Sequence, residues 1–212
     1  MKTAKFTPKR GRPSTRQVLA IDRAILATAR RILLGEGFEF LSMDAVASEL
    51  GISKGTLYAR HPSKEALTQA VIKEAVEGWS TQSARHDHRL PEELEPRLKE
   101  HLRLIGKKMN EPEPQAFYRL WRAIQQPDPE LARIFHDVGF LRGVAVIASD
   151  IERAGARDNL PPRDATKTAT LLLSALTGWF AQEASLRTVS PDEIDAAADG
   201  IVTIFMQGRS AW

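Results

Sequence analysis

Two short helical segments joined by a glycine turn stand within residues 42–62, and few folds accommodate such a pair. Ser42 and Ser53 can each cap the start of a helix, because a serine hydroxyl accepts a hydrogen bond from a free N–H of the first turn. Gly51 lies between the two segments, where glycine adopts positive φ without steric cost. Pro62 ends the second segment, because proline cannot continue a helix. Two short helices joined by such a turn predict a helix-turn-helix.

The rest of the chain also has helical periodicity. Apolar residues recur at three- and four-residue spacing from Val18 to Leu33, in a segment that Ser14 can cap. Another helix is expected from Ser63 onward, and residues 85–91 are expected to form a linker. Prolines then divide the chain into four or five further helical segments, which we predict at roughly residues 92–110, 114–125, 129–157, 162–186 and 191–207. Because no segment alternates with a period of two, the sequence predicts an all-α fold.

Charge is unevenly distributed along the chain. Residues 1–70 hold 12 Lys or Arg against 6 Asp or Glu, whereas residues 71–212 hold 18 against 21. A basic N-terminal third predicts an anionic partner at that end, and both nucleic acid and an anionic membrane surface fit this requirement.

Composition excludes several kinds of site and location. The chain has no cysteine, which excludes disulfides, zinc–thiolate sites and thiol nucleophiles and suits a cytoplasmic protein. The longest uncharged stretch, residues 168–182, is shorter than the roughly 20 apolar residues that a membrane-spanning helix needs. No phosphate-binding glycine loop, metal-binding His/Glu helix or Gly-x-Ser-x-Gly motif occurs. We therefore expect neither an enzyme nor a cofactor, a metal or a membrane partner.

The two short segments separate an inner face from an outer face. Val46, Leu50, Ile52 and Leu57 can form a small core that fixes the angle between the helices. The outer face of the second segment then carries hydrogen-bond donors and a glycine, which suit contact with phosphates and base edges in a major groove. These outer residues are Lys54, Gly55, Thr56, Tyr58 and Arg60.

Residues 41–58 read LSMDAVASELGISKGTLY, and residues 62–67 read PSKEAL. Over about residues 22–70 the sequence resembles the N-terminal domain of TetR-family (tetracycline-repressor) transcriptional regulators. The resemblance implies a three-helix helix-turn-helix domain followed by an antiparallel helical domain for ligand binding and dimerisation. We therefore predict a basic arm over residues 1–14, a DNA-binding domain over 15–70 and a ligand-binding and dimerisation domain over 71–212.

The resemblance and side-chain chemistry together suggest individual contacts with DNA. Tyr58 and Lys64 are expected to bind phosphates, and Thr56 and Ser42 phosphates or sugars. Lys54 and Gly55 are the better candidates for base edges, since lysine can donate to guanine acceptors. The full predicted set is Ser42, Ser53, Lys54, Gly55, Thr56, Tyr58, Arg60 and Lys64, with the serines acting first as helix caps. His61 stands where the family usually has Phe or Trp, and we expect it to be a partly buried packing residue.

The N-terminal arm carries a second candidate DNA-binding motif. Its residues 8–13, PKRGRP, resemble an AT-hook core, in which Arg10 and Arg12 would enter a narrow A·T minor groove. The alternative is a tail that adds only non-specific attraction to DNA.

The C-terminal half suggests an effector site and a dimer interface. Aromatic and polar residues of its helices could line a cavity for a partly apolar small molecule, although ordinary core packing would also explain them. These candidate effector residues are Met109, Phe117, Trp121, His136, Phe140 and Trp179. The helices over 162–186 and 191–207 are apolar around much of their circumference and contain small residues, which predicts pairing of two copies as a four-helix bundle.

The resemblance implies a dimeric repressor of a palindromic operator whose repression the ligand relieves. A ligand-independent global or nucleoid-type DNA-binding protein with the same fold is the alternative.

Overall fold

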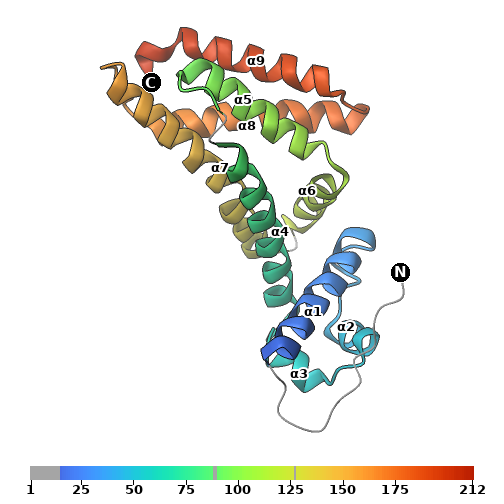
Figure 1. Cartoon of the computed structure of the whole chain (residues 1–212). Helices are drawn as coiled ribbons and strands as arrows, with labels where there is room; N and C mark the ends of the chain where they lie inside the picture. The colour runs from blue at the N-terminus through green and yellow to red at the C-terminus, as the bar shows by residue number, and fades with distance from the viewer. Residues whose placement is uncertain (1–14, 88–89, 127) are drawn as a thin grey trace. The chain divides into compact units, whose positions relative to one another are not determined.

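The structure is a computed structural model that describes residues 15–87, 90–126 and 128–212 (Figure 1). Its α-helices are α1 (Thr15–Gly35), α2 (Met43–Leu50), α3 (Lys54–Tyr58), α4 (Lys64–Asp87), α5 (Leu94–Met109), α6 (Pro112–Ile124), α7 (Pro129–Arg157), α8 (Ala165–Leu186) and α9 (Pro191–Gln207). A short 3-10 helix, η1, follows over Arg209–Ala211. The described residues contain no strand, so the predicted all-α fold is confirmed.

Most of the predicted helices lie close to where periodicity and prolines indicated. The segments predicted at 129–157 and 191–207 coincide with α7 and α9. The predicted linker over 85–91 is wrong at its start, because α4 continues to Asp87. This part of the sequence holds no proline or glycine before Pro91, and without such a residue the helix has no reason to end earlier. Ser14, Arg10 and Arg12 lie outside the described residues.

The chain divides into two compact units. The first contains the described residues up to Gly78 together with Ala116–Phe135, and the second contains Trp79–Gln115 and His136–Trp212. In the part of the chain that the structure describes, no helix is long and apolar enough to cross a membrane.

The first unit is organised around α1, α2 and α3. Helix α2 packs against both α1 and α3, and the three helices lie close together in Figure 1. Ile25 of α1, Val46 of α2 and Leu57 of α3 are each 0% exposed. Complete burial of one apolar side chain from each helix fixes the orientation of the short helices, which have too few residues to be stable alone.

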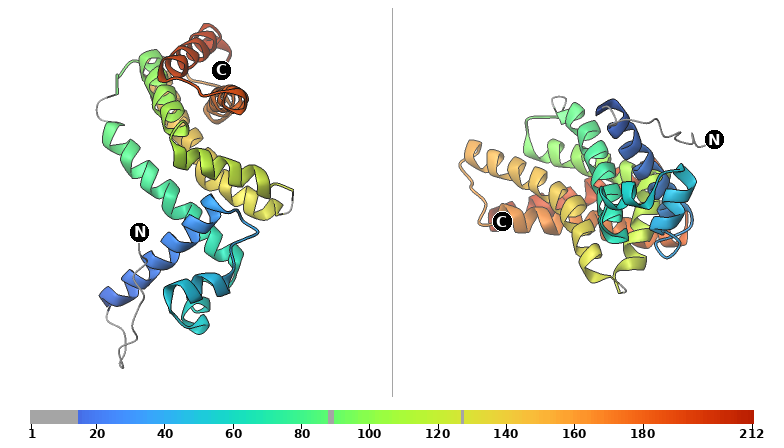
Figure 2. Two further views of the ribbon diagram at one scale, coloured as in Figure 1. Left: turned by 90° about the vertical axis from the view of Figure 1, so that its right-hand side faces the viewer. Right: turned by 90° about the horizontal axis from the view of Figure 1, so that it is seen from below.

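In the second unit, α5, α8 and α9 lie side by side (Figures 1 and 2). Leucines 98, 102, 172 and 176 belong to one buried cluster that also includes residues of α7 and α9. The approach of α5 to α9 is close, since a Cβ atom at Gly106 would lie 2.5 Å from Ile194 Cγ2. Glycine at position 106 therefore permits this packing distance.

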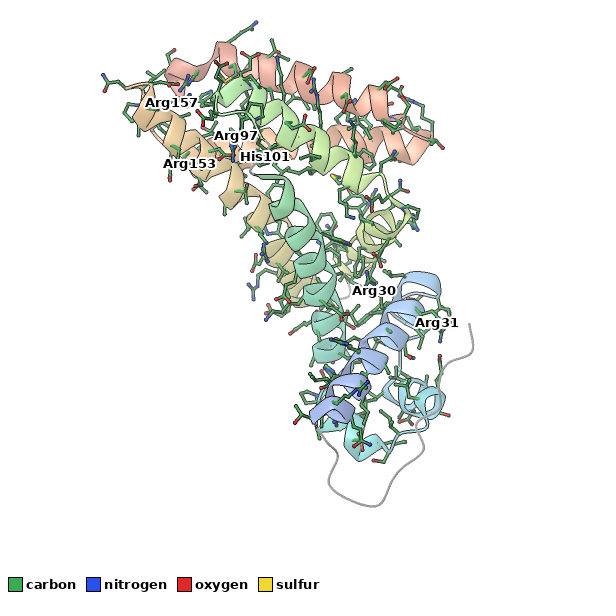
Figure 3. All side chains as sticks on the ribbon, in the orientation of Figure 1. Arg30, Arg31, Arg97, His101, Arg153 and Arg157 are labelled. Carbon is green, nitrogen blue, oxygen red and sulfur yellow. The ribbon has the colours of Figure 1, made fainter. Side chains whose placement is uncertain are left out.

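A buried carboxylate links α5 to α7 within the second unit. The Asp150 side chain is 1% exposed, and its Oδ2 lies 2.6 Å from His101 Nε2 and 2.9 Å from Arg97 Nε. Arg153 pairs with the other carboxylate oxygen, and Figure 3 labels Arg97 and His101 on α5 and Arg153 on α7. Burial alone would raise the pKa of Asp150, but the hydrogen bonds from His101, Arg97 and Arg153 outweigh it and lower the pKa to about 2.

Candidate nucleic-acid interface

The turn between α2 and α3 has the geometry that a helix-turn-helix requires. Gly51 ends α2 with φ 65° and ψ 30°, a left-handed conformation that favours glycine. Ser42 Oγ accepts from Ala45 N at 3.0 Å, and Ser53 Oγ accepts from Thr56 N at 3.1 Å. Both predicted serine caps are therefore present at the starts of α2 and α3.

Helix α3 turns its polar residues outward. Tyr58 is 45% exposed, although Leu57 beside it is fully buried. Gly55 is exposed, and a Cβ built on it would meet only Ser53 Oγ, at 3.9 Å. A ligand surface could therefore approach the backbone at Gly55 more closely than at any residue with a side chain. The Thr56 hydroxyl forms a 2.8 Å hydrogen bond with Ser53 Oγ.

Lys54 begins α3 and forms an ion pair with an acid of α2. Its Nζ lies 2.7 Å from Asp44 Oδ2, and the two side chains are 64% and 63% exposed. The hydrogen bond and charge of Asp44 raise the pKa of Lys54 and so favour its protonated form.

Arg60 lies against α1. Its Nε is 2.5 Å from Asp22 Oδ1, and its NH1 donates to the Thr56 carbonyl at 3.0 Å. The side chain is 21% exposed. These contacts connect the C-terminal end of α3 to α1, and they direct most of the guanidinium toward protein.

Lys64 begins α4, next to a third serine cap. Ser63 Oγ accepts from Ala66 N at 3.1 Å. The Lys64 ammonium lies 4.1 Å from the centroid of the Phe38 ring, within the range of a cation–π contact. Such a contact restricts where a long, flexible side chain can place its charge.

His61 is partly buried between these elements, as expected for a packing residue. Burial lowers the pKa of its imidazole and the charge of Arg60 adds to this effect, whereas Asp22 opposes it. His61 is therefore neutral at pH 7.

The sequence pattern gave no indication that Lys54, Arg60 and Lys64 contact Asp44, Asp22 and Phe38, respectively. The paired residues are 10, 38 and 26 positions apart in the chain. Periodicity indicates which face of a helix is buried, but it carries no signal for a particular polar partner on another helix.

The six predicted effector residues are distributed over both units. In the first unit, the Phe117 and Phe135 rings are 5.9 Å apart, and Trp121 Nε1 donates to the Ala132 carbonyl at 3.3 Å. In the second unit, His136 stacks on Phe140 with centroids 5.1 Å apart. Met109 and Trp179 pack against the small cluster of Phe180, Val189 and Ile194.

An open groove of about 1120 Å³ lies elsewhere on the second unit, where its wall includes Glu100, Arg103 and Arg209. None of the six predicted effector residues lines this groove.

The comparisons with known proteins agree with this geometry. Residues 25–71 match the family described as "Bacterial regulatory proteins, tetR family", and residues 96–208 match "AefR-like transcriptional repressor, C-terminal domain". The second match alone covers more than half of the chain. The protein belongs to the TetR family.

Relatives of this TetR-family chain differ in how much of it they cover. The HTH-type transcriptional regulator YvaF of Bacillus subtilis is 41% identical over 56 residues, which are 26% of this chain and 29% of YvaF. The chain thus covers less than a third of the curated relatives it matches. The solved structure of the "Flavonoid-responsive Regulator FrrA" is 28% identical with a TM-score of 0.69, over 88% of this chain and 95% of FrrA.

A Mesorhizobium loti protein assigned to the TetR family shares the fold across almost the whole chain. Its TM-score is 0.75 at 24% identity, over 92% of this chain and 98% of that one. The predicted architecture, an N-terminal helix-turn-helix followed by a helical C-terminal domain, is therefore confirmed.

Proposed function

We propose that the protein is a transcriptional repressor that binds a palindromic DNA operator as a homodimer and leaves it when a small molecule binds. The capped α2–Gly51–α3 turn, with Tyr58, Lys54 and Gly55 on its outer side, is the observation that supports this function most strongly. In this proposal residues 15–70 bind DNA, and residues 71–212 bind the effector and form the dimer.

Each predicted contact has a role consistent with its surroundings. Tyr58 donates its exposed hydroxyl to a phosphate, and Lys64, restricted by Phe38, binds a second phosphate. Lys54 and Gly55 face base edges, while Ser42, Ser53 and Thr56 contact sugar or phosphate beyond their capping role. Of the predicted DNA contacts, that of Arg60 has the least structural support, because pairing with Asp22 leaves little of its side chain exposed.

The dimer forms through α8 and α9. Leu171 of α8 is 53% exposed and Ile204 of α9 is 69% exposed. Gly178 and Gly200 are also exposed, with no atom of the chain within 4 Å of an added Cβ, so a second helix could approach closely there. Exposed apolar residues beside small ones on two neighbouring helices suit a four-helix interface between two copies.

Dimerisation sets the spacing of the recognition helices. Two copies of α3 must lie about 34 Å apart to enter successive major grooves on one face of B-DNA. A ligand can bind more tightly to a dimer with a different spacing than to the DNA-binding dimer. It then lowers operator affinity, and the ratio of its two affinities limits how far.

The effector is a small, partly apolar molecule. The aromatic side chains of Phe117 and Trp121 suit such a ligand, and the name of FrrA, 28% identical, describes a flavonoid-responsive regulator. We therefore propose planar aromatic compounds as the first candidates.

Fluorescence anisotropy with a labelled duplex from upstream of the protein's own gene tests the function. Saturable binding that weakens with salt and is reversed by a candidate compound is expected. Binding that no compound from a broad aromatic and acyl panel reverses would favour the ligand-independent nucleoid-type alternative instead.

A further inference from the structure

We propose that Lys54 and Asp44 together read one G·C base pair in the major groove, which makes Asp44 a specificity-determining residue. This inference rests on the proposed DNA-binding function and describes one position of its operator.

The pair places a donor and an acceptor side by side on the outer surface of the helix-turn-helix. Lys54 is the first residue of α3 and Asp44 the second residue of α2. Their charged atoms are 2.7 Å apart, yet about two thirds of each side chain is exposed. Both groups can therefore reach an external partner without breaking their contact.

A G·C pair offers the complementary pattern. Guanine presents the acceptors O6 and N7 in the major groove, and its partner cytosine presents the N4 amino donor. O6 and N4 hydrogen-bond to each other within the base pair, so they are about 2.9 Å apart. The Lys54 ammonium can donate to O6 and N7 of guanine while Asp44 accepts from N4 of cytosine.

A T·A pair fits less well, although it also places an acceptor next to a donor. Thymine offers the single acceptor O4 with a methyl group on its flank, so lysine loses its second acceptor and meets an apolar group. Reversing the pair to C·G brings the ammonium against an amino donor and the carboxylate against acceptors. The orientation of the base pair is therefore read as well as its identity.

Stability gives only a small reason for an acid at this position, because Asp44 in the first turn of α2 stabilises that helix by at most about 1 kcal/mol. Ion pairs this exposed contribute about 0–1 kcal/mol, and a carboxylate near a duplex is repelled by phosphates. That repulsion lowers affinity for every sequence, and only a base pair with a correctly placed amino donor offsets it. An unfavourable group of this kind increases specificity while it decreases overall affinity.

Other acids of the first unit also form ion pairs, and those of Glu77 with Lys73 and of Glu130 with Arg133 are about as exposed as that of Asp44. Asp22 is paired with Arg60, whose side chain is mostly buried, and Glu49 with Arg31, which also contacts Glu36. None of these pairs includes an N-terminal residue of α3.

Affinity for operator duplexes that carry each of the four base pairs at each symmetric position tests the proposal. The operator is first selected by the wild-type protein from random duplexes. Wild type is expected to prefer G·C by about ten- to a hundredfold at one position. D44N should lose about tenfold of that preference while it binds unrelated DNA more tightly. K54Q should lose preference at the same position, and D44E should retain part of it.

E152Q is the matched control, because Glu152 is exposed on α7 of the second unit and the substitution removes the same charge. Its base preferences should equal those of wild type. If D44N, with an unchanged melting temperature, tightened binding to all duplexes equally and kept every base preference, the reading role of Asp44 would be overturned. If wild type bound no duplex in a salt-dependent manner, the proposed DNA-binding function itself would fail.

Discussion

At the scale of single residues, phosphate contacts have a measurable signature. K64Q should weaken binding to all duplexes similarly and reduce the slope of log affinity against log salt by about one, because one fewer counterion is released. Y58F should weaken binding about tenfold, since it removes a hydrogen bond to a charged group, and should leave the slope unchanged. K73Q is the charge control, because Lys73 is exposed on α4, nine residues after Lys64. Equal slopes for K64Q and wild type would exclude the phosphate contact of Lys64.

His61 should make the DNA-binding unit sensitive to acid. The folded protein lowers the pKa of His61, mainly by burial, so the unfolded chain binds the proton more readily. Stability is therefore highest above about pH 6.5 and decreases as pH falls below that value. H61F should remove this loss between pH 7 and 5, as measured by chemical denaturation. If H61F still lost stability between pH 7 and 5, a group other than His61 would be responsible for the acid sensitivity.

Folding also lowers the pKa of Asp150, but here it favours the charged form, and the loss of stability occurs at lower pH than for His61. Its pKa falls from 3.8 to about 2 on folding, so its stabilising effect is complete above about pH 4 and is lost as pH falls through 2. At neutral pH, D150N should decrease the free energy of unfolding by about 3 kcal/mol, because it removes the buried charge that accepts hydrogen bonds from Arg97 and His101. E152Q on the same helix should have little effect. Similar denaturation midpoints for D150N and wild type would contradict this interpretation of the cluster.

At the scale of helices, close packing of α5 on α9 depends on Gly106. G106A should destabilise the protein by about 1–3 kcal/mol, since the added methyl would overlap Ile194 and force the helices apart. G78A is the control, because a Cβ at this helical position meets no atom within 4 Å. This second substitution should be neutral or stabilise by about 1 kcal/mol. Thermal unfolding distinguishes the two variants. If G106A melted at the same temperature as wild type, close packing of α5 on α9 would not contribute to stability.

The elements were largely predictable from local sequence. Ser42, Gly51 and Ser53 set the turn by interactions with neighbours three or four residues away, so their roles follow from the sequence alone. Prolines 129 and 191 marked the first residues of α7 and α9 for the same reason. The end of α4 was harder to predict, because polar residues without a helix breaker are compatible with both helix and linker.

The interface was predictable only in part. Exposure of Tyr58 and Gly55 followed from periodicity, because the buried position of Leu57 determines the outer face of a one-turn helix. The attachment of Arg60 to Asp22 and the buried Asp150 cluster depend instead on contacts between distant helices. Such polar contacts require tertiary structure, because the hydrophobic pattern that defines a helix is the same with or without them.

At the scale of the whole molecule, operator binding should depend on dimerisation. L171E and I204E should shift the protein toward a monomer in analytical ultracentrifugation and weaken operator binding, because each places a charge in the proposed α8–α9 interface. V146E is the control, since Val146 is a similarly exposed residue on α7. Both variants remaining dimeric, with wild-type operator affinity, would exclude this interface.

A salt titration of DNA binding shows whether α2, Gly51 and α3 form a DNA-reading unit. The purified protein is titrated into labelled duplex from upstream of its own gene, between about 50 and 200 mM salt. We predict saturable binding that weakens steeply as salt increases, in proportion to the number of phosphates contacted. Absence of salt-sensitive affinity for this duplex and for every duplex in a random pool would contradict this DNA-reading role.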